Sequence, residues 1–129
     1  MDNVMAPVSP GELLDKITIL EIKAERIEDA QKNANVRVEL NLLNAIWASD
    51  VPDVDVAEER AALKAVNEKL WEIEDDIRDE ERAKRFGERF VELARSVYFT
   101  NDERARLKKV INTKMGSQIV EEKSYSDYA

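Results

Sequence analysis

Any chemistry in this 129-residue chain must come from carboxylates, lysines, arginines and hydroxyl or amide side chains, because it contains no histidine and no cysteine. It therefore lacks the usual general base near neutral pH, a thiolate nucleophile and the common ligands of zinc. A bound metal ion would be a hard, oxygen-liganded one such as magnesium. The candidates are charged side chains beside the apolar faces of predicted helices.

Two carboxylates in the segment around residue 70 lie beside such a face. Apolar residues three and four apart predict a helix there: Leu63, Val66, Leu70, Ile73 and Ile77. At about 100° per residue, Glu74 and Glu81 fall next to this face, and Asn67 and Arg78 fall just outside it. Carboxylates beside a core are costly unless they are paired. We expect a buried network with Arg78, Arg95 or Arg104, or alternatively a carboxylate–arginine site that holds an anion or magnesium.

The first predicted helix also has charged residues at the edge of its apolar face. Lys16, Lys23 and Glu21 flank that face. The plainer interpretation is lysines that extend their stems over apolar surface and form ion pairs along the helix. The functional interpretation is a polar pocket at the seam between helices.

Two enzyme templates fit these residues in form. Helical nucleotide pyrophosphohydrolases hold magnesium with E-x-x-E and E-x-x-D pairs, which Glu72 and Asp75 imitate, together with Glu25 and Glu28. A helical chorismate-mutase type of site needs basic residues around a dicarboxylate, as Lys16, Lys23, Arg78 and Arg95 could provide. Neither spacing is diagnostic in a chain with 37% charged residues. Whether the chain is an enzyme therefore stays open at this point.

The charge distribution restricts the class of partner. A net charge of −8 argues against general nucleic-acid binding, although residues 78–116 carry 11 basic and 7 acidic side chains and could present a basic face. No apolar run is long enough to span a bilayer, and the first residues lack the features of a signal peptide. These features and the absence of cysteine predict a cytoplasmic protein.

The elements that position these residues are helices. Residues 9–12 (SPGE) form a capping box before a helix whose apolar face includes Leu13, Ile17 and Leu20. Ile19 and Ile22 form a second apolar stripe on this helix. A helix that is apolar on two sides is central in a bundle or shared with a partner, so this stripe is a candidate interface for a homo-oligomer or another protein.

The remaining pattern predicts an all-α fold, an antiparallel bundle of four to five helices in a single domain spanning residues 1–129. Asn33 and Asn35 indicate a break before a second helix that starts at about Val36. A third helix follows the capping box at residues 55–58 and reaches Arg82, and a turn falls at residues 86–87. A further capping box at residues 100–103 predicts a boundary between a fourth and a fifth helix, which ends at Gly116. Residues 1–8 form a lead, and residues 117–129 form a loose tail or an extended strip on the bundle.

Three blocks of the sequence resemble a small bacterial family classed as a domain of unknown function. They are residues 9–23 (SPGELLDKITILEIK), residues 67–78 (NEKLWEIEDDIR), and residues 90–98 (FVELARSVY) with residues 116–125 (GSQIVEEKSY). The resemblance spans nearly the whole chain. It implies a setting near glycosyltransferase and surface-polysaccharide genes and no established activity. It also singles out polar residues that packing alone would not require: Glu12, Asp15, Lys16, Lys23, Asn67, Glu74, Arg78, Arg95, Tyr98, Asn101, Asp102, Arg104 and Glu121, Glu122 and Lys123.

Two functional hypotheses follow. The first is a non-catalytic accessory or interaction module, with a protein partner or a second copy bound through Ile19 and Ile22. The second is a pocket for an anionic metabolite such as a nucleotide sugar, with or without catalysis and magnesium. Its candidate ligand-binding residues are Lys16, Lys23, Asn67, Glu74, Arg78, Glu81, Arg95, Tyr98 and Arg104.

Overall fold

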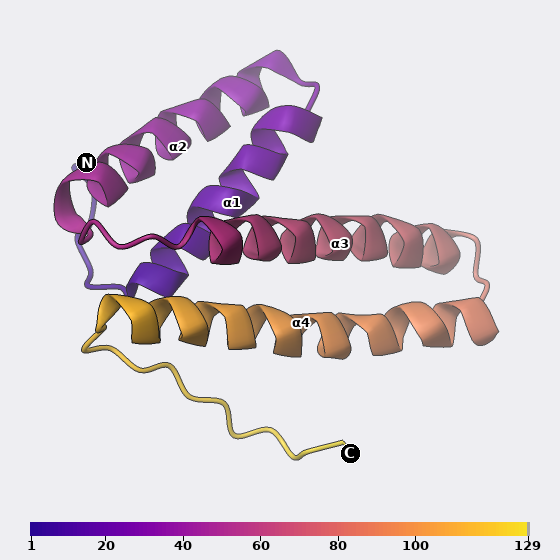
Figure 1. Cartoon of the computed structure of the whole chain (residues 1–129). Coiled ribbons are helices and arrows are strands. Elements are labelled where there is room, and N and C mark those ends of the chain that lie inside the picture. The colour runs from indigo at the N-terminus through magenta and orange to yellow at the C-terminus, as the bar shows by residue number, and fades with distance from the viewer. Residues whose placement is uncertain (129) are drawn as a thin grey trace.

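The computed structural model describes residues 1–128 and contains four helices: α1 (Pro10–Arg26), α2 (Ala30–Asp50), α3 (Ala57–Arg82) and α4 (Glu88–Met115). No strand occurs in this part of the chain, which confirms the predicted all-α class. The helices form two hairpins, α1–α2 and α3–α4, and the first half of α1 crosses the second hairpin (Figure 1). Within residues 1–128, no helix is both long and apolar enough to cross a membrane.

The start of α1 confirms half of the predicted capping box. The Ser9 hydroxyl accepts a hydrogen bond from the backbone N–H of Glu12 at 3.2 Å, and Pro10 occupies the first turn. The Glu12 carboxylate, however, accepts from Nζ of Lys108 at 2.5 Å. We attribute this to α4, which brings a cation within reach of Glu12 and so offers a stronger bond than a backbone N–H.

The break predicted at Asn33 and Asn35 is wrong, because α2 already begins at Ala30. Asp29 caps it by accepting from the N–H of Lys32 at 2.9 Å. Asn33 lies inside α2 and donates its Nδ2 to the carbonyls of Ala24 (2.8 Å) and Ile27 (3.0 Å). Its amide therefore satisfies carbonyls at the end of α1 instead of interrupting α2.

The boundary predicted at residues 100–103 is also wrong, because α4 is continuous from Glu88 to Met115. No glycine or proline occurs between these residues, and α4 packs along α3, so nothing ends the helix at Thr100. Gly116 does end it, with a left-handed φ of +65°, and the N–H of Ser117 reaches the carbonyl of Asn112 at 2.9 Å.

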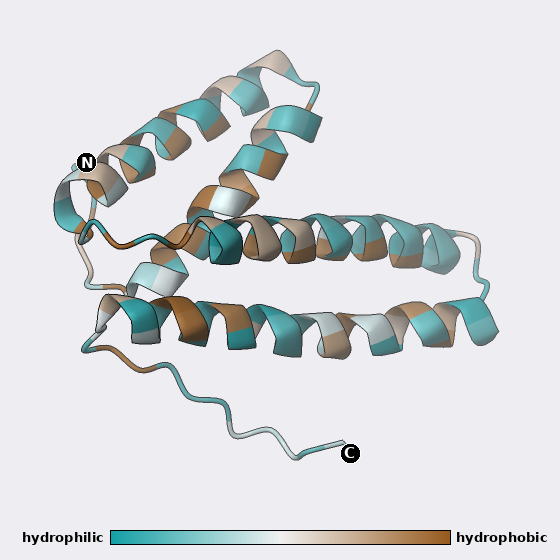
Figure 2. Ribbon diagram, in the orientation of Figure 1, coloured by the Kyte–Doolittle hydropathy of each residue, from teal (hydrophilic) through white to brown (hydrophobic). Residues whose placement is uncertain are grey.

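The apolar core lies where α1, α3 and α4 meet. Its main cluster consists of Leu14, Val56, Leu63, Leu107, Ile111 and Met115, with Trp47, Val51 and Val66 packed at its edge. Within residues 1–128, six further apolar residues are buried: Leu13, Ile17, Leu20, Ile22, Ile73 and Leu93. Hydrophilic residues cover much of every helix outside it (Figure 2). Since α1 lies against all three other helices, its two apolar sides are explained by a central position in the fold.

Candidate functional site

A buried carboxylate joins three of the helices. Asp15 on α1 is 1% exposed. It accepts from Nε and Nη2 of Arg104 on α4 at 2.8 and 2.5 Å, and from Nδ2 of Asn67 on α3 at 3.0 Å. Thr18 completes the group, accepting from Asn67 at 3.1 Å and donating to the carbonyl of Asp15 at 2.9 Å. We call these four residues the Asp15 network.

The electrostatics of the Asp15 network favour a structural role. The two-pronged hydrogen bond to Asp15 raises the pKa of Arg104, against the opposing effect of burial. Among the described residues no buried side-chain nitrogen or oxygen lacks a hydrogen-bond partner. Because Asp15, Asn67 and Arg104 lie on three different helices, their hydrogen bonds tie α1, α3 and α4 together.

A second polar group fixes the first turn of α1 on α4. The backbone N–H of Gly11 donates to Oδ1 of Asn112 at 2.7 Å. Lys108 bridges Glu12 and Glu121 at 2.5 and 3.1 Å, and the Ser9 hydroxyl donates to Glu121 at 3.0 Å. Burial lowers the pKa of Lys108, but its hydrogen bonds to the two glutamates outweigh this and raise it overall. A Cβ on Gly11 would lie 2.5 Å from the carbonyl oxygen of Lys108, so only glycine fits this approach.

The tail, residues 117–128, runs back along α4 as an extended strip (Figure 1). Asp102 binds Tyr128 and Lys123 of the tail, the latter at 3.1 Å, and these hydrogen bonds lower the pKa of Asp102. The ring of Tyr128 also packs edge-on against Phe99, with centroids 4.7 Å apart. Of the two forms expected for the tail, the structure shows the strip.

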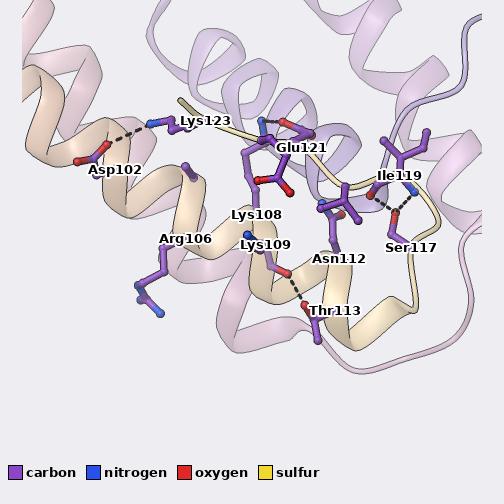
Figure 3. Close-up of a pocket in the computed structure, with 13 residues that line it drawn as sticks. Asp102, Arg106, Lys108, Lys109, Asn112, Thr113, Ser117, Ile119, Glu121 and Lys123 are labelled. Carbon is purple, nitrogen blue, oxygen red and sulfur yellow. Dashed lines mark hydrogen bonds and ion pairs between the residues drawn. The ribbon is translucent and has the colours of Figure 1, made fainter. Parts of the chain in front are cut away.

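A hollow of about 570 Å³ lies between the tail and α4. Figure 3 shows Lys123 reaching to Asp102 across it and Ser117 bonded to Ile119 at its other end. Four basic side chains line it, Arg106, Lys108, Lys109 and Lys123, with three acidic ones, Asp102, Glu121 and Glu122. The charges therefore nearly cancel.

A second hollow, of about 500 Å³, lies beside the Asp15 network. It is lined by Ile19, Ile22, Asn67, Leu70, Trp71, Glu74, Asp75, Arg78, Asn101 and Arg104. We call it the central hollow. It brings together four of the nine predicted ligand-binding residues: Asn67, Glu74, Arg78 and Arg104.

The expected burial of Glu74 and Glu81 is wrong, because both are exposed. Glu74 pairs with Arg78 one helical turn away at 3.2 Å, and the two side chains are 50% and 75% exposed. Ion pairs join α1 to α3 as far as Glu72, which pairs with Arg26, whereas the far end of α3 has only α4 beside it (Figure 1). The covered stripe is therefore narrower there than the sequence pattern suggests.

The other predicted residues lie apart from the central hollow. Lys16 is exposed and Lys23 is half-buried on α1. Arg95 and Tyr98 are exposed on α4, where the guanidinium of Arg95 lies 5.8 Å from the ring centre of Phe99. Of the four residues that the chorismate-mutase arrangement needs, Lys16, Lys23, Arg78 and Arg95, only Arg78 lines the central hollow.

The acidic residues do not gather around a common point. Within residues 1–128 no three acidic side chains lie close enough to hold a metal ion. Glu72, one of the two magnesium candidates, pairs with Arg26 at 3.3 Å, and the other, Asp75, lines the central hollow.

Sequence reasoning missed several residues that hold the helices together. Thr18, Lys108 and Asn112 were not among the candidates, although each makes contacts between segments far apart in the chain. Asn112 directly follows two apolar residues, Val110 and Ile111, and its position beside this apolar pair was an available signal.

A family model described as a family of unknown function (DUF6165) matches residues 4–128, so the chain belongs to this family. No curated protein and no solved structure gives a significant match. The family membership agrees with the expected family of unknown function, whereas the motifs and the genomic setting stay predictions.

Proposed function

We propose that the chain is a non-catalytic helical interaction module that works in the cytoplasm beside enzymes of glycan or surface-polysaccharide assembly. The observation that carries this is its large accessible surface. The 14.8-kDa chain exposes 9023 Å², whereas a compact monomer of this mass exposes about 7000 Å². Part of the excess belongs to the extended lead and tail. The far end of the α3–α4 hairpin, where no third helix covers the pair, also contributes (Figure 1).

The charge balance supports the same proposal. The central hollow is lined by two cations, Arg78 and Arg104, and two carboxylates, Glu74 and Asp75. Arg104 also forms an ion pair with Asp15, which lies outside the lining. The surroundings of the hollow therefore have no excess of positive charge to attract a strongly anionic ligand. Among the charged candidates, Glu74 pairs with Arg78 and Arg104 pairs with Asp15.

The end of the α3–α4 hairpin, residues 83–91, offers a surface for a protein partner. Phe86 is 53% exposed and Val91 is 52% exposed, and the rings of Phe86 and Phe90 meet edge-to-face with centroids 5.2 Å apart. Exposed aromatic side chains on a charged hairpin are typical anchors of protein interfaces. We call this surface the hairpin tip. The assignment to glycan assembly rests on the sequence resemblance alone.

Affinity capture of the tagged full chain from a bacterium that contains it tests the proposal. We expect an enzyme of glycan assembly to be enriched with the wild-type chain and lost with the variant Phe86→Ser/Val91→Ser. The matched control, Val4→Ser/Met5→Ser, removes two side chains that are 80% and 81% exposed in the lead and should keep the enzyme. Enrichment of no such enzyme, or equal enrichment with the hairpin-tip variant, would contradict the proposal.

A second candidate function is the binding of a polar metabolite in the central hollow. Its volume of about 500 Å³ and the half-buried indole of Trp71 favour it. Because the lining charges balance, a ligand that carries both signs or many hydroxyl groups fits better than a polyanion. Thermal-shift measurements with free sugars, amino sugars and amino acids, and with nucleotide sugars, sugar phosphates and dicarboxylates as the anionic comparison, each with and without magnesium, test this. A ligand at about one hundred times its Kd should raise Tm by several degrees, and Arg78→Ala should abolish the shift. No shift across the panel would exclude these ligand classes.

A further inference from the structure

The helix α2 has an unusual composition for its place in the fold. None of its 21 residues is buried, yet residues 40–49 (LNLLNAIWAS) contain no charged side chain in a chain with 37% charged residues. Within residues 1–128, α2 lies against α1 alone among the helices and forms the outer edge of the molecule (Figure 1). Solvent-facing helices normally carry charges on the open side, so the lack of charge here needs an explanation.

Apolar side chains occur on two opposite faces of α2. The face toward α1 carries the half-buried Val36, Leu40, Leu43 and Trp47. The opposite face carries exposed residues at alternating spacings of four and three: Gln31, Asn35, Val38, Leu42, Ala45 and Ser49. We call this second set the outer α2 seam. Its spacing is that of the contact positions of a coiled coil, and its middle members, Val38, Leu42 and Ala45, are apolar, which favours packing against another helix. Val38 is 72% exposed and Leu42 is 46% exposed, so this seam has no cover in the single chain.

We propose that the outer α2 seam packs antiparallel against the same seam of a second copy of the chain. Association would cover Ala45 and the side chains of Val38 and Leu42, which are 72% and 46% exposed. Removing such apolar surface from water favours the packing of two helices.

The charge of the chain favours this face for a second copy. Two chains with a net charge of −8 repel each other, and the repulsion is least where the contact surface has no charges. In an antiparallel pair centred between Leu42 and Ala45, each leucine lies opposite the partner's alanine, so large side chains meet small ones. A parallel pair would bring together the acidic ends that carry Asp50, Asp53 and Asp55 in both copies, which is unfavourable.

The interface is independent of the proposed function, because it uses α2 and leaves the hairpin tip free. Sedimentation equilibrium of the full chain tests it. We expect a mass of twice 14.8 kDa for the wild type and a single-chain mass for Val38→Glu/Leu42→Glu, with an unchanged helical circular dichroism spectrum. The matched control Val91→Glu changes an apolar residue that is 52% exposed elsewhere and should stay dimeric. A monomeric wild type, or a dimer that survives the double substitution, would overturn the proposal, whatever the capture experiment finds.

Cysteine cross-linking tests the orientation and does not require a destabilising charge. The chain has no cysteine of its own, so each disulfide reports one introduced pair. We expect Leu42→Cys/Ala45→Cys to give a disulfide-linked dimer under mild oxidation. Val38→Cys alone should not, because an antiparallel pair with this centre places the two Val38 positions 11 residues apart, about 16 Å along the helices. Efficient cross-linking of Val38→Cys alone would mean a parallel pair and would overturn the proposed arrangement.

Discussion

The substitution Asp15→Asn tests whether the Asp15 network holds the helices together. It keeps the shape of the side chain but removes its charge and replaces one acceptor oxygen with an NH₂ group. One of the two N–H groups of Arg104 that now bind Asp15 would then face another donor. Breaking a fully buried ion pair costs about 3–5 kcal/mol. Since the Arg104 side chain is 30% exposed, water can solvate part of it. We therefore expect the free energy of unfolding to fall by about 2–4 kcal/mol.

Urea denaturation followed by circular dichroism measures this loss, and a double-mutant cycle identifies its origin. Asp15→Leu/Arg104→Met leaves no charge unpaired and should recover most of the stability that Asp15→Leu alone loses. The exposed pair of Glu74 and Arg78 provides the control, and Arg78→Ala should cost less than about 0.5 kcal/mol. A loss below about 1 kcal/mol for Asp15→Asn, no more than an ordinary hydrogen bond contributes, would refute the reasoning.

Three further predictions concern the contacts around the network. Gly11→Ala should lower the free energy of unfolding by about 1–3 kcal/mol in urea denaturation, because the added Cβ would collide with the Lys108 carbonyl. Gly87→Ala is the control and should cost clearly less, because a Cβ there would meet open space. Equal losses for the two variants would contradict the close approach at Gly11. Hydrogen bonds from the tail lower the pKa of Asp102. At a pH above the pKa of a free aspartate, the charged Asp102 therefore holds the tail, and this stabilisation is lost as the pH falls through the lowered pKa of Asp102 in the folded chain. Acidification below about pH 4 should therefore release the tail before the helices unfold, seen in NMR as the loss of contacts between the rings of Tyr128 and Phe99. Asp102→Asn should weaken these contacts already at pH 7, and contacts that do not depend on pH would refute this. Glu74→Ala should change Tm by less than about 2 °C because the side chain is 50% exposed, and a large decrease would place Glu74 in a buried network after all.

The sequence predicts local features best where a residue's own chemistry decides them. The Ser9 cap, the predicted end of the third helix at Arg82 and the Gly116 stop all appear in the structure. The capping-box pattern at residues 100–103 failed because a threonine and a glutamate three apart are equally compatible with the middle of a helix. Only the continuous packing of α4 along α3 decides between the two.

The candidate site is less predictable because it depends on where helices cross. Helical phase identifies Asn67 as close to an apolar face, and the resemblance adds Asp15 and Arg104, but only the crossing of α1 with α3 and α4 brings the three together. The same phase argument fails for Glu81, because the far part of the α3–α4 hairpin has no third helix beside it. The close approach at Gly11 depends on tertiary packing and has no direct signal in a single sequence.

Quantitative affinity capture tests the central claim, that the surface left open by the two hairpins binds another protein. The measured quantity is the ratio of each captured protein between the wild-type chain and Phe86→Ser/Val91→Ser, determined by mass spectrometry with both chains at equal levels. The account predicts at least one glycan-assembly enzyme with a high ratio, and a ratio near one when the wild type is compared with Val4→Ser/Met5→Ser. If no protein depends on the hairpin tip while a metabolite raises the Tm of the purified chain, the interaction-module account is contradicted and the central hollow becomes the functional site.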